Sequence, residues 1–534
     1  MNFDVLIKNG LLIDGTGKKG FCASLAIGGD RIVAVIPGKM VRPAKRAGGT
    51  AGVFAVAGAP DIAGASGLKS TRTVDATGKI ICPGFIDIHS HGDLAVFSKD
   101  NPKIPQGVTA EVVGNCGLSV YPVSGAARSD WANRWQAIWG RKNTWGWETV
   151  ADYVSAVKRR ASVDVYPLAG YGSLRFYVAG MKQGLDIFEK KRIYRETERA
   201  LDSGACGVSI GLAYPPCQFA GSEELTAVCR LLVKKSKYLS CHIRDEGDTV
   251  LESIEKVMGF VRKTGVRLQI SHLKAYGSQN WHKTEKIVRL IESANISGYE
   301  VNFDFYPYIA GSTLLFALFP DWVHQMGWSS LKDPAIRQKI RQFYQREKFT
   351  NYGSCLGWDK VVVGGVKNKE NKKYAGRSIA ELSQQTGKDW IDIVSKIIVS
   401  EKGEVGMLLF GMNEKSLKEI MRSPYGILGS DGLYGRHPHP RTFGAFVRFL
   451  KKYCIDEGVL TLEEGIHRMT GMPARKLGLS RCGVIKEGYK ANIVIFSPDR
   501  LRERASYTSP EETPRGIERV YVSGKMVYPR DCTG

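Results

Sequence analysis

The stretch Gly84-Phe85-Ile86-Asp87-Ile88-His89-Ser90-His91 comes directly after an apolar run, Lys79-Ile80-Ile81-Cys82. Residues i and i+2 of an extended strand point to the same face. His89 and His91 can therefore direct both imidazole rings at one metal ion. Two polar residues at a strand end would produce the same pattern, and the pair alone does not separate these alternatives. The remainder of the chain has to decide between them.

Strand-like segments alternate with helix-like segments after the histidine pair. Seven further strands are expected at 109–113, 163–168, 207–210, 238–241, 267–270, 300–305 and 425–428. Helical segments are expected at 131–160, 223–237 and 249–264. This alternation is typical of a parallel α/β architecture. Together with the strand that carries the histidine pair, it predicts a (β/α)8 TIM barrel.

Polar side chains suited to chemistry occur where these strands end. Barrel enzymes place their active sites at the carboxyl ends of the strands, so such residues can converge on one rim. The six candidate metal ligands are His89, His91, Cys116, His242, His272 and Asp431. Each histidine taken singly could be a core residue, but the set as a whole favours a metal site. Imidazole with thiolate favours zinc over magnesium or calcium, and Asp431 fits the carboxylate that takes a proton from the attacking water.

Charge and cysteine content limit the possible environments and partners. The 534 residues carry 76 Lys and Arg against 53 Asp and Glu, a formal net charge of +23. The basic residues are scattered in short groups, which predicts a solvated surface and an anionic small-molecule substrate rather than a nucleic-acid partner. The eleven cysteines contain no Cys-x-x-Cys pair, and no apolar run approaches the ~20 residues of a membrane helix. These features predict a cytoplasmic protein with reduced thiols and no membrane partner. The oligomeric state is left open.

The two ends of the chain have the patterns of short strands. Residues 1–79 and 483–534 are expected to pack together as a composite β-sandwich domain, because the strands of the tail need partners. A Gly/Ala-rich segment, 47–67, is expected to be an insertion in that domain. The barrel is assigned to 80–482, with a long insertion at 313–424.

Several motifs of this chain resemble those of one enzyme family. They are 84–91, Gly114-Asn115-Cys116-Gly117-Leu118-Ser119, 211–216, 242–247, Ser271-His272-Leu273-Lys274, 306–313, 430–432, 439–441, 469–474 and 488–496. The sequence resembles the N-acyl-D-amino-acid deacylases, or D-aminoacylases, of the amidohydrolase superfamily. The Gly-Asn-Cys-Gly and Ser-His-Leu-Lys segments are the specific part of the resemblance, because many amidohydrolases share the His-x-His pair. The resemblance covers most of the chain.

The resemblance implies a zinc-dependent hydrolase that cleaves N-acyl-D-amino acids into a carboxylate and a free D-amino acid. Cys116, His242 and His272 would hold a tightly bound zinc, and His89 and His91 a second, weaker metal, with Cys116 bridging and Asp431 adjacent. Asp431 would be the general base and later protonate the leaving amine. The residues that would bind the substrate are Lys274, Tyr306, Ser312, Arg441 and Tyr214. The insertion 313–424 would form a lid over the site.

Three alternatives stay open. A hydantoinase-like or dihydroorotase-like enzyme would cleave cyclic amides, but the fourth strand, 207–211, has no lysine to bridge two metals. A D-dipeptidase would use the same chemistry as a deacylase. A catalytically inactive scaffold is disfavoured by the complete ligand set. Tyr171 stands where the family often has a histidine, so the pocket for the amino-acid side chain is expected to differ.

Overall fold

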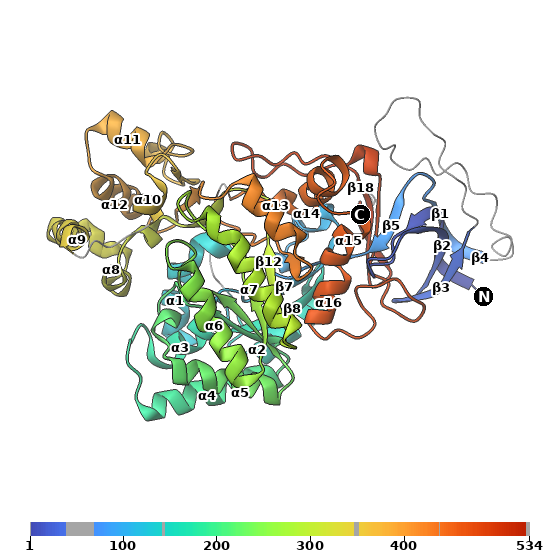
Figure 1. Ribbon diagram of the computed structural model, residues 1–534, viewed down its shortest axis with the longest axis horizontal. Helices are drawn as coiled ribbons and strands as arrows, with labels where there is room; N and C mark the ends of the chain where they lie inside the picture. Colours follow the sequence, from blue (N-terminus) through green and yellow to red (C-terminus); the bar gives the residue numbers. More distant parts are fainter. Residues whose placement is uncertain (1, 39–68, 141–144, 347–351, 437, 530–534) are drawn as a thin grey trace.

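The computed structural model describes residues 2–38, 69–140, 145–346, 352–436 and 438–529. The Gly/Ala-rich segment 47–67 lies outside the described residues. These described residues form three sheets: a β-domain sheet, the sheet of a barrel, and a small sheet in an inserted subdomain. The barrel lies between the other two parts, with the β-domain at one end of the molecule and the inserted subdomain at the other (Figure 1).

Eight parallel strands form the barrel, as the alternating pattern predicts. They follow one another in chain order: β6 (Phe85–Asp87), β7 (Val108–Val113), β8 (Asp164–Gly170), β9 (Gly207–Gly211), β10 (Tyr238–His242), β11 (Arg267–Ile270), β12 (Val301–Phe305) and β16 (Gly426–Leu428). A parallel bridge between Ser90 and Gly432 brings the ends of β6 and β16 together. The barrel is therefore nearly closed, and its strand ends share one rim.

Helices surround the barrel. They are α1 (Gly125–Trp139), α2 (Val150–Arg160), α3 (Tyr171–Ala179), α4 (Ile187–Asp202), α5 (Ser222–Lys234), α6 (Val250–Thr264), α7 (Thr284–Ile296), α13 (Glu414–Arg422), α14 (Arg441–Arg448), α15 (Leu462–Met469) and α16 (Gly471–Lys476). The single helical segment expected at 131–160 is two helices. Gly140, in a left-handed conformation, ends α1, and Thr149 caps α2 through a capping box with Asp152.

Both ends of the chain build the β-domain. Its strands are β1 (Asn2–Leu12), β2 (Phe21–Gly28), β3 (Arg31–Pro37), β4 (Lys69–Asp75), β5 (Ile80–Pro83), β17 (Ile493–Phe496), β18 (Ile517–Val522) and β19 (Lys525–Tyr528). The expected barrel boundary at residue 80 is wrong, because β5 belongs to this sheet. It pairs with β1 on one side and with β17 on the other, and the barrel sheet begins at Phe85.

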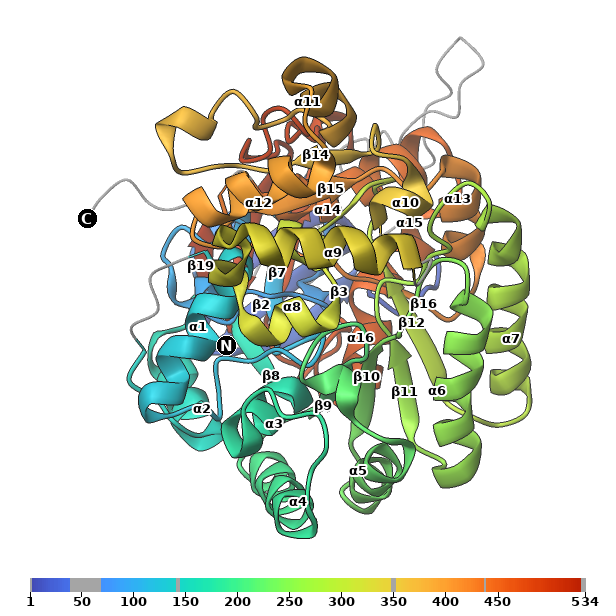
Figure 2. The ribbon, with the colours of Figure 1, turned by 90° about the vertical axis from the view of Figure 1, so that its left-hand side faces the viewer.

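The insertion after β12 forms a subdomain with its own apolar core. It contains β13 (Gly311–Leu314), β14 (Val361–Val363), β15 (Gly406–Leu409), α8 (Asp321–Met326), α9 (Pro334–Arg346), α10 (Tyr352–Leu356), α11 (Ile379–Thr386) and α12 (Trp390–Ser400). Figure 2 views the molecule from the side of the inserted subdomain, and α8 and α9 lie in front of the barrel strands in this view. The expected end of the insertion at 424 is too late, because α13 packs on α7 and β16 of the barrel. None of the helices described is long and apolar enough to cross a membrane.

Candidate metal centre

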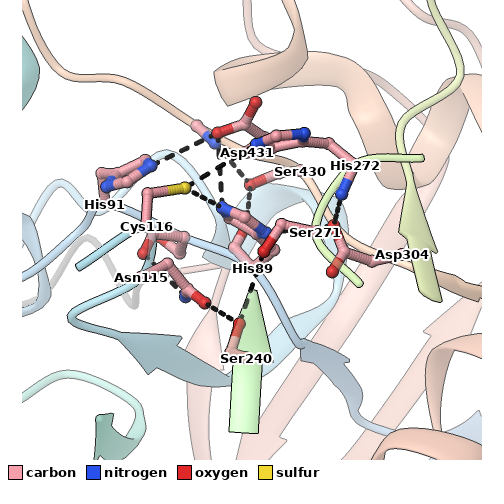
Figure 3. Close-up of polar contacts among 12 residues, drawn as sticks. His89, His91, Asn115, Cys116, Ser240, Ser271, His272, Asp304, Ser430 and Asp431 are labelled. Atoms are coloured by element: carbon pink, nitrogen blue, oxygen red, sulfur yellow. Dashed lines mark hydrogen bonds and ion pairs between the residues drawn. The ribbon is translucent and has the colours of Figure 1, made fainter. Parts of the chain in front are cut away.

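The six candidate metal ligands meet at the rim of the barrel. His89 and His91 follow β6, Cys116 follows β7, His242 ends β10, His272 follows β11 and Asp431 follows β16. All six side chains are buried. Their ligand atoms fall into three overlapping groups, each within 4.8 Å: His89, His91 and Cys116; Cys116, His242 and His272; and His89, His272 and Asp431. Figure 3 shows five of the six gathered together: His89, His91, Cys116, His272 and Asp431.

Cys116 belongs to both of the first two groups. Cys116 Sγ lies 3.3 Å from His89 Nε2 and 3.7 Å from His272 Nε2. Buried polar atoms are normally hydrogen-bonded, yet neither ring nitrogen of His242 has a partner in the described structure, and Nδ1 of His91 has none either. The His242 ring, unpartnered and within 4.8 Å of the Cys116 and His272 ligand atoms, suits a metal ion, so the residues present fit the zinc site that the ligand types predict.

Three of the ligand residues have backbone conformations that non-glycine residues rarely adopt. The φ angle is +55° at Cys116, +48° at Asp431 and +34° at His272. Left-handed backbone at such residues carries a cost of order 1–3 kcal/mol and concentrates at functional sites. Each of these residues follows the end of a barrel strand, and each contributes a ligand atom to the cluster.

The electrostatics of the site favour the ionised forms of both acidic ligands. Burial raises the pKa of the Cys116 thiol, but the charge of His89 and the hydrogen bonds from neighbouring histidines outweigh it and hold that pKa well below its usual value. Burial likewise opposes ionisation of Asp431, but the Arg441 guanidinium and the histidines bring its pKa well below the usual range. Thiolate and carboxylate are the forms that bind a metal ion.

Two carboxylates that the sequence analysis missed orient two of the histidines. His89 Nδ1 donates to Asp304 Oδ1 at 3.0 Å, and His272 Nδ1 lies 2.8 Å from Glu246 Oε1. Both contacts leave Nε2 of the ring free to face the cluster, the arrangement found where a carboxylate supports a metal-binding histidine. Asp304 is the one carboxylate of strand β12, and a carboxylate inside a strand is the signal that could have revealed it. For Glu246, the only signal in the sequence is its position four residues after His242.

Replacing Asp304 by asparagine should weaken metal binding. An amide side chain at this position has one acceptor oxygen, whereas the Asp304 carboxylate accepts from His89 Nδ1, the His272 backbone N–H and Gln269. Loss of a residue that supports a metal ligand in this way typically costs 10–100-fold in metal affinity, and we expect a loss in that range for Asp304→Asn. Competition for zinc with a chromophoric chelator measures it. Asp321→Asn, on the exposed start of α8, is the control. An unchanged zinc affinity in Asp304→Asn would refute the supporting role.

A buried polar network lies below the cluster and holds the segment that carries Asp431. The Ser430 N–H and Oγ donate to the two oxygens of Asp87 at 2.9 and 2.5 Å. Lys103 Nζ pairs with Asp87 at 3.0 Å and also hydrogen-bonds Ser430. All three side chains are fully buried. The network fixes the start of the β16 end loop relative to β6, and therefore the distance between Asp431 and the histidine pair.

The five residues expected to bind substrate line one cavity with the cluster. This inner cavity is bounded by Lys274, Tyr306, Ser312, Arg441 and Tyr214 together with His91, Cys116, His242, His272 and Asp431. Lys274 Nζ pairs with Glu246 at 2.6 Å, so its charge is already partly neutralised. The Tyr214 ring packs against His242 and Trp135, with centroids 4.8 and 5.8 Å apart.

Arg441 is the most exceptional residue of the inner cavity. Its Nη2 pairs with Asp431 Oδ2 at 2.8 Å and donates to the Ser312 carbonyl at 3.3 Å. The guanidinium lies 4.5 Å from the centre of the Tyr306 ring. Nε and Nη1 are buried and have no hydrogen-bond partner among the described residues. Buried donors without partners are costly, and an anionic group of a ligand would satisfy them.

Tyr171 does not reach this cavity. Its hydroxyl donates to Glu224 at 2.7 Å, and Glu224 also accepts from Arg175. Tyr171 is absent from the residues that line the inner cavity. Tyr171 therefore makes no direct contact with the inner cavity through which it could change the pocket for the amino-acid side chain.

Comparison with known proteins gives one consistent family. The model of an amidohydrolase family matches residues 72–169 and 400–528. The chain is 31% identical to a D-aminoacylase of Alcaligenes xylosoxydans xylosoxydans, over 98% of this chain and 94% of that protein. It resembles the crystal structure of N-acyl-D-glutamate deacylase from Bordetella bronchiseptica, complexed with zinc and a phosphonate mimic of the tetrahedral intermediate (TM-score 0.80, 28% identity, 100% and 98% coverage).

A structure of D-aminoacylase that addresses its binuclear metal centre is equally similar, with a TM-score of 0.81, 29% identity, and coverage of 100% of this chain and 98% of that one. These matches extend over the β-domain, the barrel and the inserted subdomain. The chain therefore belongs to the D-aminoacylase family of the amidohydrolases.

Proposed function

We propose that this protein is a zinc-dependent hydrolase of N-acyl-D-amino acids. The single observation that carries the proposal is the juxtaposition of the ligand cluster with a buried guanidinium whose Nε and Nη1 are unpartnered among the described residues. A substrate of this site needs a hydrolysable bond at the cluster and an anionic group a few ångströms away. An N-acyl amino acid has both. The names of the relatives supply the D configuration and the linear amide.

Cys116, His242 and His272 would hold the tightly bound zinc, and His89, His91 and Asp431, together with Cys116, would hold a second metal ion. When bound, zinc polarises the amide carbonyl and lowers the pKa of the attacking water. Asp431 is ionised at neutral pH, and its Oδ1 is free of Arg441, so this oxygen accepts the proton of the water. The same oxygen then passes the proton to the leaving amine nitrogen.

The α-carboxylate of the substrate would bind in the inner cavity. Arg441 Nε and Nη1 have no hydrogen-bond partner among the described residues, and Tyr306, Ser312 and Lys274 line the same cavity. Fixing the carboxylate at a set distance from the cluster places the amide, rather than another bond, at the attacking water. We also infer a cytoplasmic location, supported by the ten described cysteines, all of which are free thiols.

The test is amine release from matched N-acetyl-D- and N-acetyl-L-amino acids by the zinc-loaded protein. We expect hydrolysis of D-substrates and a rate on L-enantiomers lower by about 100-fold or more, since about 3 kcal/mol separates a fitted from a misplaced carboxylate. Hydantoins, dihydroorotate and dipeptides with a C-terminal D-residue form the comparison panel. Faster turnover of a cyclic amide or a D-dipeptide than of every N-acetyl-D-amino acid would overturn the proposal in favour of that class.

A further inference from the structure

His439 is a buried histidine near the rim that the proposed reaction does not use. Its ring is fully buried, and it lies two residues before Arg441, the buried cation of the inner cavity. Both ring nitrogens have a backbone partner: the Arg441 N–H donates to Nδ1 at 3.0 Å, and Nε2 lies 2.9 Å from the Ala310 carbonyl oxygen. His439 therefore connects the segment that carries Arg441 to the segment that follows β12.

These two contacts fix which ring nitrogen carries the proton. Because an N–H group donates to Nδ1, this nitrogen has no proton, and the neutral ring carries its proton on Nε2, which donates to the Ala310 carbonyl. Burial and the charge of Arg441 hold the pKa of His439 well below its usual value, so the ring stays neutral. His439 is thus an acceptor toward Arg441 and a donor toward Ala310.

The contact at Nδ1 satisfies a backbone group at the start of a helix. Arg441 is the first residue of α14, and the first N–H groups of a helix have no partner within the helix. The N-cap residue is Pro440, whose side chain makes no capping hydrogen bond. The His439 ring accepts from the Arg441 N–H instead, and it therefore fixes where α14 begins.

The segment after β12 also holds the side chain of Arg441. Arg441 Nη2 donates to the Ser312 carbonyl at 3.3 Å, only two residues beyond Ala310. The backbone of Arg441, through His439, and its guanidinium are thus both tied to residues 310–312, by separate contacts. The position of α14 relative to this segment therefore decides where the guanidinium lies in the inner cavity.

Aromatic side chains hold the His439 ring in this orientation. The rings of Tyr308 and Tyr507 both meet it at nearly right angles, with centroids 5.1 and 5.2 Å away. The Tyr308 hydroxyl in turn donates to Glu503 at 2.5 Å. Tyr507 and Glu503 lie between β17 and β18, so the C-terminal part of the chain supports this contact. The ring cannot turn over and exchange its two nitrogens without displacing these neighbours.

We propose that His439 is a positioning residue for Arg441: it holds the start of α14 against the segment after β12, and so places the guanidinium to meet the carboxylate of the substrate. The inference rests on the proposed function, and it adds a residue that does not itself line the inner cavity. Without the ring nitrogens, the Arg441 N–H and the Ala310 carbonyl would be left without these partners, which is costly for buried groups. The loss should therefore appear in the recognition of the carboxylate.

The experiment compares kcat/KM for one N-acyl-D-amino acid and for its C-terminal amide, which lacks the carboxylate charge. The acid-to-amide ratio measures recognition of the carboxylate and does not depend on the fraction of protein that is folded. His439→Phe keeps an aromatic ring but removes both nitrogens, and it should lower the ratio by about tenfold or more, the cost of a buried donor without a partner. His439→Asn keeps an acceptor oxygen near the position of Nδ1. Its ratio should lie between those of the wild type and His439→Phe, about threefold or more above the latter, because one hydrogen bond is retained.

His467→Phe is the matched control. His467 Nδ1 also contacts a backbone carbonyl oxygen, that of Gly15, at 2.7 Å. His467 lines neither the inner cavity nor the larger cavity of about 560 Å3 that opens beside it. This variant should leave the acid-to-amide ratio as in the wild type.

The outcomes separate this inference from the proposed function. An acid-to-amide ratio that His439→Phe leaves unchanged, even if both rates fall, would give His439 a purely structural role and overturn the inference alone. A ratio in His439→Asn no higher than that in His439→Phe would also overturn it, because the contact at Nδ1 would then carry no effect. Absence of hydrolysis of both compounds by the zinc-loaded wild type would overturn the proposed function, and the inference with it.

Discussion

Replacing Asp431 by asparagine should lower kcat by about 10³-fold while zinc remains bound. Asp431 Oδ1 lies 3.3 Å from His91 Nε2 and 3.5 Å from His89 Nε2, and Oδ2 is held by Arg441. The substitution keeps the shape of the side chain but removes its ability to accept a proton. Proton transfer by a positioned side chain typically contributes 10²–10⁴-fold, and 10³-fold corresponds to about 4 kcal/mol of barrier.

The measurement is the single-turnover rate together with the zinc content of the same sample. Because Cys116, His242 and His272 form a complete group without Asp431, at least one zinc per chain should remain in Asp431→Asn. Asp499→Asn makes the same chemical change at an exposed position that lines neither cavity, and it should keep wild-type activity. A kcat within tenfold of the wild type for Asp431→Asn, with zinc bound, would remove Asp431 from the role of general base.

Substitution of Cys116 by serine should remove the metal and the activity together. Cys116 is the one residue shared by the two groups of His89, His91 and of His242, His272. A serine hydroxyl does not ionise at neutral pH and is a poor zinc ligand compared with a thiolate. Loss of a residue that only supports a metal ligand costs up to ~100-fold in metal affinity. Cys116 is itself a candidate ligand, so we expect zinc affinity to fall by more than this, and kcat/KM to fall in parallel when zinc is limiting.

Zinc per chain, measured by atomic absorption after dialysis, checks this expectation. Cys217→Ser is a matched control, because Cys217 is also buried near the rim and accepts a hydrogen bond from Gly211 N–H, which serine can replace. This control should keep its zinc. Stoichiometric zinc and normal turnover in Cys116→Ser would show that the cluster is not the reaction centre, and the proposed mechanism would be wrong.

The barrel and the candidate ligands could be predicted from the sequence because the signals for both lie in short segments of the chain. Strand and helix periodicity are properties of short segments, and the ends of parallel strands must share one rim. His242 and His272 follow apolar strand patterns whose ends are visible without any tertiary information. The same reasoning failed at β5, whose apolar pattern suits either sheet. Its membership is decided by pairing with β17, where Ile81 lies opposite Ile495, a residue far away along the chain.

Only the tertiary structure decided the residues that act through distant partners. Asp304 supports His89 from β12, and Arg441 reaches Asp431 while two of its donors stay unpartnered among the described residues; neither relation has a sequence spacing that could reveal it. The cavity of about 560 Å3 beside the metal centre likewise depends on the inserted subdomain, which has its own apolar core and supplies part of the cavity wall. The sequence by itself therefore determined the fold and the metal chemistry of this protein. The shape that selects its substrate arises from non-local packing, which a linear pattern does not encode.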